Sequence, residues 1–186
     1  MLRTEGLKVS GKITIRSYKA GTLHLYQTLV DLGRLDLARE LLADGKIEVE
    51  THNLIVDSSN YGIDILVQYL LSAYNGSNPF PLGIAWGEIG TGTATPTAGD
   101  TALTTPTNRA PVAFAQDSML NTAQFQFFFP DAVLANGTYT ECGSFIGGSS
   151  SIGSGNMFNH ALFDSPYSKS SGVDSTLEID IALANS

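Results

Sequence analysis

The chain has a single cysteine, Cys142, among its 186 residues. One thiol forms no disulfide within the chain, and it completes neither a cysteine metal cluster nor a redox pair. Only 10 residues are lysine or arginine against 18 acidic ones, which gives a formal net charge of -8. Because binding to nucleic-acid phosphates requires clustered basic side chains, the composition argues against a nucleic-acid partner.

Long apolar runs are also missing. No stretch approaches the ~20 apolar residues of a membrane-spanning helix, so we expect no membrane partner. Residues 1–16 lack the apolar core of a signal peptide, and we therefore expect synthesis in the cytoplasm. Charged residues make up 15% of the chain, against ~25% in a typical domain. Such a weakly charged polar surface is typical of a particle component that lies against neighbours, and also of an extracellular lectin.

Residues that support catalysis or bind metals are few and scattered. His24, His52 and His160 lie in different predicted elements, without H-E-x-x-H spacing or a cysteine partner. No G-x-S-x-G elbow is present, and the serines of 147–155 lie in a tract that we expect to be flexible. Asp100 is an oxygen ligand of the kind that calcium prefers, but one carboxylate makes no site. We predict no enzyme activity, no metal site and no cofactor, unless His52 or His160 joins acids in a cleft.

Alternating apolar positions dominate the chain. They predict strands at 7–18, 47–56, 83–89, 110–116, 122–129, 138–146, 156–163 and 175–183. In two of these strands the inward residues are especially clear: Phe125, Phe127 and Phe129, and then Leu177, Ile179, Ile181 and Leu183. Glu178 and Asp180, which alternate with the latter set, should face water. Strands at this spacing are typical of a sandwich or a barrel.

Two segments show helical periodicity instead. Residues 23–44 predict a hairpin of two short helices, interrupted at Gly33 and closed by Gly45 as a C-cap. Residues 61–74 predict an amphipathic helix with one buried face, preceded by N-cap candidates at 57–60. We therefore predict a mainly β fold: an antiparallel, jelly-roll-like β-sandwich with one packed amphipathic helix and a short N-terminal helical hairpin.

The predicted domain boundary lies at the end of that hairpin. Residues 1–45 form an arm and the helical hairpin, and residues 46–186 form the β-sandwich domain. Helices of ~10 residues are marginal in water unless their leucine-rich faces dock on something. If that is a neighbouring protein, the hairpin is an attachment element; if it is the sandwich, the hairpin is part of the core.

A strand that contains Trp86 leads into a Gly- and Thr-rich loop. Gly90-x-Gly92 resembles the start of a dinucleotide fingerprint, but Thr95 occupies the place of the third glycine and no helix is expected to follow. Loops of about a dozen residues in a compact domain usually have a function. We predict assembly or loop contacts at Gly90, Thr91, Gly92, Thr93, Pro96 and Asp100, and on the hairpin at Leu25, Leu29 and Leu41.

A series of linked motifs runs along the chain in one order. They are HNLIV at 52–56, IGTGT at 89–93 with Pro96, DTAL at 100–103, ANGTY at 135–139 and Glu141-x-Gly143. The series resembles a family of small structural proteins encoded by tailed bacteriophages, over residues 50–183. The chain departs from this pattern at Glu88, at Cys142 and in the segment up to Gly45.

The resemblance implies a non-enzymatic virion protein of the tail, baseplate or fibre-attachment region. Its partners would be other virion proteins and copies of itself, in a trimer or larger ring, because identical subunits close most simply by symmetry. A capsid decoration protein is one alternative. Another is a carbohydrate-binding module for host glycans that stacks sugars on Trp86, Tyr139 or Tyr167, and exposure of Trp86 would favour it.

Overall fold

The computed structural model describes residues 7–55, 83–119 and 122–185 of the chain. Along these residues the order of elements is β1 (Leu7–Lys19), α1 (Thr22–Asp31), α2 (Leu35–Ala43), β2 (Lys46–Ile55), β3 (Ile84–Gly90), β4 (Pro106–Met119), β5 (Thr122–Phe129), β6 (Gly137–Ile146), β7 (Asn156–Lys169) and β8 (Val173–Asn185). The fold is mainly β with two short helices, at the positions that the alternation and the helical periodicity predict. The amphipathic helix predicted at 61–74 and its N-caps at 57–60 lie outside the described residues.

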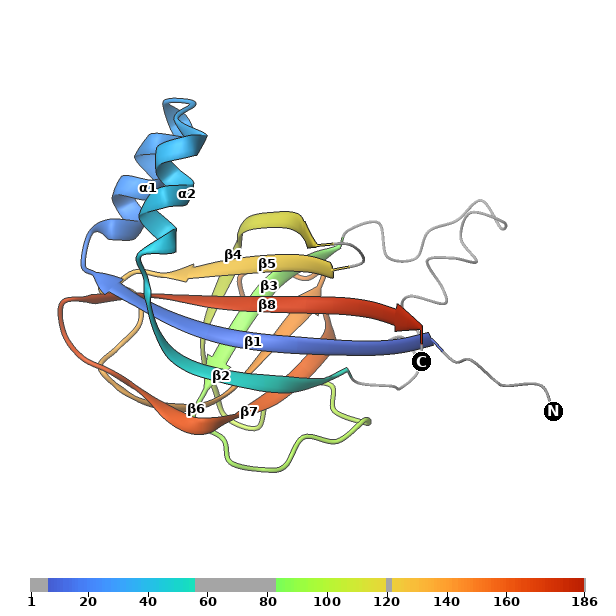
Figure 1. The fold of residues 1–186 in the computed structure, drawn as a ribbon. Helices are drawn as coiled ribbons and strands as arrows, with labels where there is room; N and C mark the ends of the chain where they lie inside the picture. The colour runs from blue at the N-terminus through green and yellow to red at the C-terminus, as the bar shows by residue number, and fades with distance from the viewer. Residues whose placement is uncertain (1–6, 56–82, 120–121, 186) are drawn as a thin grey trace.

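The strands close into one antiparallel barrel, in the order β1-β2-β7-β6-β3-β4-β5-β8 (Figure 1). The prediction of a β-sandwich is therefore wrong. All 13 residues of β1 pair with β8, from Leu7 opposite Asn185 to Lys19 opposite Val173, and β1 also pairs with β2. This pairing joins strands from the two ends of the chain. Alternation shows which side chains of a strand point inward but not which strand lies beside it, so it does not distinguish a closed barrel from two packed sheets.

Aromatic and branched side chains fill the barrel. Phe127 and Phe129 of β5 and Leu177 and Ile179 of β8 are all buried in one hydrophobic cluster, as the alternation predicts. Gly87 of β3 makes room for this packing, because a Cβ atom at this position would collide with the ring of Phe127. The absence of a side chain at Gly87 thus leaves room for the large ring of Phe127 on β5.

The outer face of β8 does not follow the prediction. Glu178 was expected to face water, but only 7% of it is exposed, and Asp180 is half-buried. Glu178 lies within 3.9 Å of Arg16 on β1 and accepts a hydrogen bond from Gln126 on β5. Strand alternation alone predicted solvent on this face, whereas the helical hairpin covers part of it.

The helices α1 and α2 form a hairpin that stands off the barrel wall (Figure 1). Gly33 lies in the turn between them with φ of 71°, a left-handed conformation that favours glycine. Gly45 is not the left-handed C-cap that we predicted, because its φ lies outside that region. Instead, its missing side chain leaves space for the ring of Tyr18, with which a Cβ atom would collide.

The base of the hairpin packs on the outside of the barrel. Its buried residues are Leu23 and Tyr26 of α1 and Ala38 and Leu42 of α2, which cluster with Tyr18 of β1 and Phe128 of β5. The rings of Tyr26 and Phe128 meet edge to face with centroids 4.9 Å apart. The two marginal helices are therefore stabilised by the barrel itself. No helix in the described part of the chain is long and apolar enough to cross a membrane.

The predicted boundary at residue 45 falls between α2 and β2. β1 precedes the boundary and is one of the barrel strands, so the barrel draws on both predicted domains. The division at residue 45 stays a prediction, which a deletion can test.

Candidate functional site

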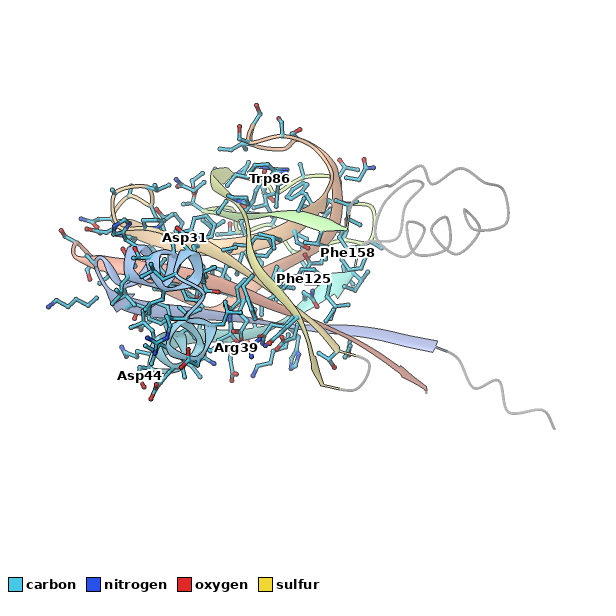
Figure 2. The ribbon with its side chains drawn as sticks, turned by 90° about the horizontal axis from the view of Figure 1, so that it is seen from above. Asp31, Arg39, Asp44, Trp86, Phe125 and Phe158 are labelled. Atoms are coloured by element: carbon cyan, nitrogen blue, oxygen red, sulfur yellow. The ribbon has the colours of Figure 1, made fainter. Side chains whose placement is uncertain are left out.

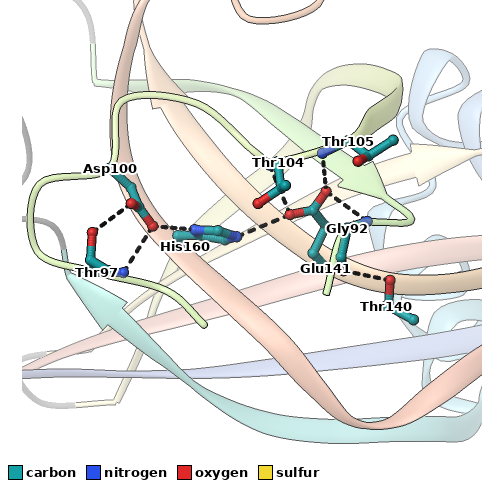
Figure 3. Close-up of polar contacts among 8 residues, drawn as sticks. All are labelled: Gly92, Thr97, Asp100, Thr104, Thr105, Thr140, Glu141 and His160. Carbon is teal, nitrogen blue, oxygen red and sulfur yellow. Dashed lines mark hydrogen bonds and ion pairs between the residues drawn. The ribbon is translucent and has the colours of Figure 1, made fainter. Parts of the chain in front are cut away.

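A buried carboxylate fixes the loop that joins β3 to β4 (Figure 3). Glu141 of β6 has no exposed surface. Its Oε1 atom accepts hydrogen bonds from the backbone N–H groups of Gly92 (2.9 Å) and Thr105 (2.6 Å), and its Oε2 atom accepts one from Thr104 (3.0 Å). Both ends of the loop are thus attached to the same side chain.

The two glycines of the IGTGT motif let the backbone of the loop lie close to the carboxylate of Glu141. Gly90 and Gly92 are buried, and a Cβ atom at either position would collide with the carboxylate of Glu141. The hydroxyl of Thr140 also donates to the backbone oxygen of Gly92, at 2.7 Å. The motif therefore holds a protein carboxylate against the backbone rather than a phosphate group.

A histidine links Glu141 to the middle of the same loop. His160 of β7 is buried, with Nδ1 at 2.6 Å from an oxygen of Asp100 and Nε2 at 3.2 Å from Oε2 of Glu141. Ionised carboxylates only accept hydrogen bonds, so the ring satisfies both partners when it carries a proton on each nitrogen.

Asp100 is further held by Thr97, whose backbone N–H and hydroxyl donate to it at 2.9 and 2.6 Å. Partial burial by itself would raise the pKa of Asp100. The hydrogen bonds from Thr97 and His160 more than offset this effect, and the pKa of the carboxyl group lies below its usual value. A chain of hydrogen bonds thus holds the loop. It connects Thr97 to Asp100, Asp100 to His160 and His160 to Glu141.

No protein family, curated protein or solved structure matches this chain. The resemblance to bacteriophage proteins consequently rests on the motifs in the sequence. Within residues 7–55, 83–119 and 122–185, no three His, Cys, Asp or Glu side chains are placed to hold one metal ion.

A second buried ion pair holds the Gly- and Ser-rich loop at 147–155. Glu88 of β3 accepts hydrogen bonds from Arg109 of β4 (2.5 Å) and from the backbone N–H of Gly153 (2.6 Å), and Arg109 also donates to the backbone oxygen of Ser154. We expected this tract to be a flexible loop. The structure attaches it to two buried side chains at Gly153 and Ser154, and its flexibility stays a prediction.

The aromatic residues considered for sugar stacking do not form an exposed surface. Trp86 is half-buried, and the guanidinium group of Arg109 lies 5.1 Å from the centre of its ring. Tyr139 and Tyr167 are buried; the hydroxyl of Tyr139 donates to Ala135, 2.7 Å away. A sugar site would therefore have to use other side chains.

The predicted contact residues fall into two groups on opposite sides of the barrel (Figure 1). In the loop, Thr91 and Thr93 are exposed, and Pro96 and Asp100 are partly exposed. On the hairpin, Leu25 is exposed, whereas Leu29 and Leu41 are half-buried against the hairpin cluster. The participation of either group in assembly stays a prediction.

Sequence reasoning missed the groups that fix these loops. Asp100 and Glu141 are 60 and 19 positions from His160, so no local motif joins them. A signal was nevertheless present. Glu88 and Glu141 interrupt otherwise apolar or small-residue strands, and an acidic residue at a predicted core position indicates a buried partner.

Proposed function

We propose that this chain is a non-enzymatic structural subunit that works through protein–protein contacts, as a virion protein of a tailed bacteriophage. The tail, baseplate or fibre-attachment region is the location that the sequence motifs favour, and the capsid surface is the alternative. The observation that carries the proposal is the apolar tip of the helical hairpin.

The hairpin tip is the segment from Leu32 to Leu37, and α1 carries another exposed leucine, Leu25, in its first turn. Leu32 is 71% exposed, Leu35 52%, Leu25 48% and Leu37 36%. Single exposed leucines are common, but several on one projecting element mark a contact with another protein. The base of the hairpin already packs on the barrel, so the tip is the part left to bind a neighbour.

The opposite side of the barrel carries a second preformed surface, the loop of residues 91–105. Its attachment to Glu141 and His160 keeps the exposed Thr91 and Thr93 in place. A surface that is rigid before binding loses less conformational entropy when it meets a partner. Two contact surfaces on opposite sides suit a subunit that lies between neighbours in a larger assembly.

The charged cluster under the loop also favours a structural role. Both ring nitrogens of His160 are engaged by carboxylates, and the ring is buried. A general acid or base must reach a proton of the substrate. In this arrangement both ring nitrogens of the histidine instead contact the carboxylates that hold the loop.

The proposal predicts that the hairpin tip drives self-association. Replacing both Leu32 and Leu35 by glutamate puts two charges into the expected contact and should leave a monomer in sedimentation velocity at high micromolar concentration. Ile152→Glu is the matched control, because Ile152 is also exposed (47%) but lies on another loop. Wild-type protein and the control should sediment as oligomers. Equal sedimentation of all three proteins would overturn the role of the tip.

A further inference from the structure

An apolar groove of about 770 Å³ lies beside the hairpin, between α1 and the strands β4 and β5. Leu23 and His24 of α1 form one of its walls, and no residue of α2, which the structure describes in full, lines it. Figure 2, which looks down on the hairpin, shows Asp31 at the end of α1 on the side of Trp86 and Asp44, just after α2, on the opposite side. The groove therefore lies on the α1 side of the hairpin, and we call it the α1 groove.

The barrel side of the α1 groove is apolar although it faces solvent. Pro111 and Ala113 of β4 line it and are exposed. The half-buried ring of Phe128 on β5 extends this surface, and the exposed Ala132 follows β5. The solvated face of an antiparallel sheet usually carries polar residues, and a contiguous exposed apolar surface indicates a binding site for another molecule.

The hairpin tip is a suitable apolar occupant, but it cannot reach the groove of its own chain. The groove lies against the first turns of α1, whereas the tip follows the last residue of this helix. The helix has 10 residues and is about 15 Å long, which keeps the two surfaces apart. The tip of a second copy has no such restriction. The other large exposed hydrophobic side chains of the described residues are scattered over β2 and two loops: Ile47, Leu54, Val133 and Ile152.

The charges of the two surfaces also match. Two aspartates line the α1 groove: Asp174 is buried and bound to backbone N–H groups, whereas the side chain of Asp131 is 29% exposed beside Lys169. A carboxylate has about four lone pairs, so Asp131 can accept a further hydrogen bond. The hairpin tip carries Arg34, whose contact with Asp36 at 3.7 Å is exposed to solvent and therefore weak. Arg34 is thus available to pair with Asp131 of a second copy.

We infer that the α1 groove of one copy binds the hairpin tip of the next copy. Leu32 and Leu35 pack on the apolar floor beside Ala113, and Arg34 pairs with Asp131. The contact joins two different surfaces of identical chains, so the arrangement is head-to-tail and closes into a ring where the rotation between neighbours completes a circle. This inference rests on the assembly role proposed above for the tip, and it adds the surface that receives the tip.

Sedimentation velocity of variants that each lose one half of the contact tests this pairing. Ala113→Glu puts a charge on the floor of the groove and should weaken self-association at least about tenfold, because the charge loses its hydration in an apolar contact. The tip variant, Leu32→Glu with Leu35→Glu, should be monomeric. Mixed in equal amounts, the two variants should form a dimer of twice the chain mass, because the first keeps an intact tip and the second an intact groove. Ala113→Ser, which keeps a small side chain in the groove, and Ala43→Glu, at the exposed end of α2 outside the groove, should associate like wild type.

The pattern of association separates this inference from the assembly role. A monomeric tip variant beside an Ala113→Glu protein that associates like wild type would overturn the role of the groove and leave the assembly role of the tip intact. A mixture in which no dimer forms would also overturn the inference, because the groove and the tip would then not bind each other. Wild-type protein that stays monomeric, or a tip variant that associates like wild type, would overturn the assembly role itself. Circular dichroism monitors folding, and Ala132→Glu, at a second exposed position of the groove, replaces Ala113→Glu if that protein is not folded.

Discussion

Glu141 combines complete burial with four hydrogen-bonding partners. Three are backbone N–H groups of the β3–β4 loop and the fourth is the ring of His160. A buried carboxylate without such donors is strongly destabilising, so this one side chain and the loop that supplies its donors depend on each other. The loop is ordered by this electrostatic contact together with the apolar packing of Leu103 against Phe145 and Met157.

Replacing Glu141 by glutamine should loosen the loop. The amide nitrogen of glutamine is a donor and would face donors of the loop, so we expect a loss of about 2–4 kcal/mol in the free energy of unfolding. Amide hydrogen exchange at Gly92, Thr104 and Thr105 should accelerate in the variant. Glu50→Gln on the exposed face of β2 is the control and should leave those amides protected. Unchanged exchange in Glu141→Gln would show that the loop does not depend on this carboxylate.

Stability should fall in acid because several carboxyl groups, Asp131 and Asp100 among them, have a pKa below the ordinary value. The pKa of Asp131 is lowered by its hydrogen bond from Lys169, and the pKa of Asp100 is lowered as described above. A group whose pKa is lower in the folded than in the unfolded state stabilises the fold above its unfolded pKa, here ~4. That contribution is lost as the pH drops through the lower folded value.

Urea unfolding between pH 7 and pH 2 measures this dependence. Asp100→Asn should reduce the acid-induced loss of stability, because the residue no longer changes its charge. Asp36→Asn, at an exposed position of α2, should keep the wild-type pH dependence. An identical pH profile for wild type and Asp100→Asn would contradict the assignment.

At the scale of elements, the attachment of α1 depends on Asp174 of β8. Its Oδ2 atom accepts hydrogen bonds from the backbone N–H groups of Gly21 (2.9 Å) and Leu23 (3.0 Å). Its Oδ1 atom accepts one from the backbone N–H group of Asp131 (2.9 Å). The side chain therefore caps the helix from a distant strand, since no local side chain does so.

Asp174→Ala should remove this cap and cost about 2–3 kcal/mol of folding free energy, because three donors lose one buried acceptor. Chemical denaturation measures the loss, and faster hydrogen exchange in α1 than in β7 would locate it. Asp36→Ala, in the exposed first turn of α2, is the matched control. Equal stability of Asp174→Ala and wild type would mean that the hairpin is held by its apolar base alone.

Deleting residues 1–45 removes β1 as well as the hairpin. Because β1 pairs with both β2 and β8, the deletion opens the barrel along two edges, and we expect an aggregated product. Light scattering and thermal unfolding monitored by circular dichroism would detect this. A soluble fragment that melts cooperatively would instead support the division at residue 45.

Features that depend on local patterns can be predicted from the sequence, whereas contacts between residues far apart in the chain cannot. Strand β5 is predicted to the residue because Phe125, Phe127 and Phe129 alternate locally. The pairing of β1 with β8 spans nearly the whole chain and leaves no local pattern, so the barrel was mistaken for a sandwich. Glu178 was placed in water because alternation shows that it points outward but not that another element covers that face. The contact of His160 with Asp100 and Glu141 was missed for the same reason.

At the scale of the whole molecule, the barrel holds two different surfaces apart. The hairpin tip is apolar, and the loop of residues 91–105 on the opposite side is polar and rich in threonine. Like charge on every copy, -8 per chain, opposes indiscriminate contact between subunits. We therefore expect the contact between the apolar hairpin tip and a specific site on a neighbouring subunit to set the geometry of an assembly.

Hydrogen–deuterium exchange of the wild-type chain at low and at high micromolar concentration tests this account most directly. If the tip is an assembly contact, peptides that cover residues 32–37 gain protection as the concentration rises, while peptides that cover 147–155 do not. The mass in solution should rise in parallel above the 19.7 kDa of one chain, to a trimer or larger ring. Exchange at 32–37 that is independent of concentration, together with a monomeric mass throughout, would contradict it.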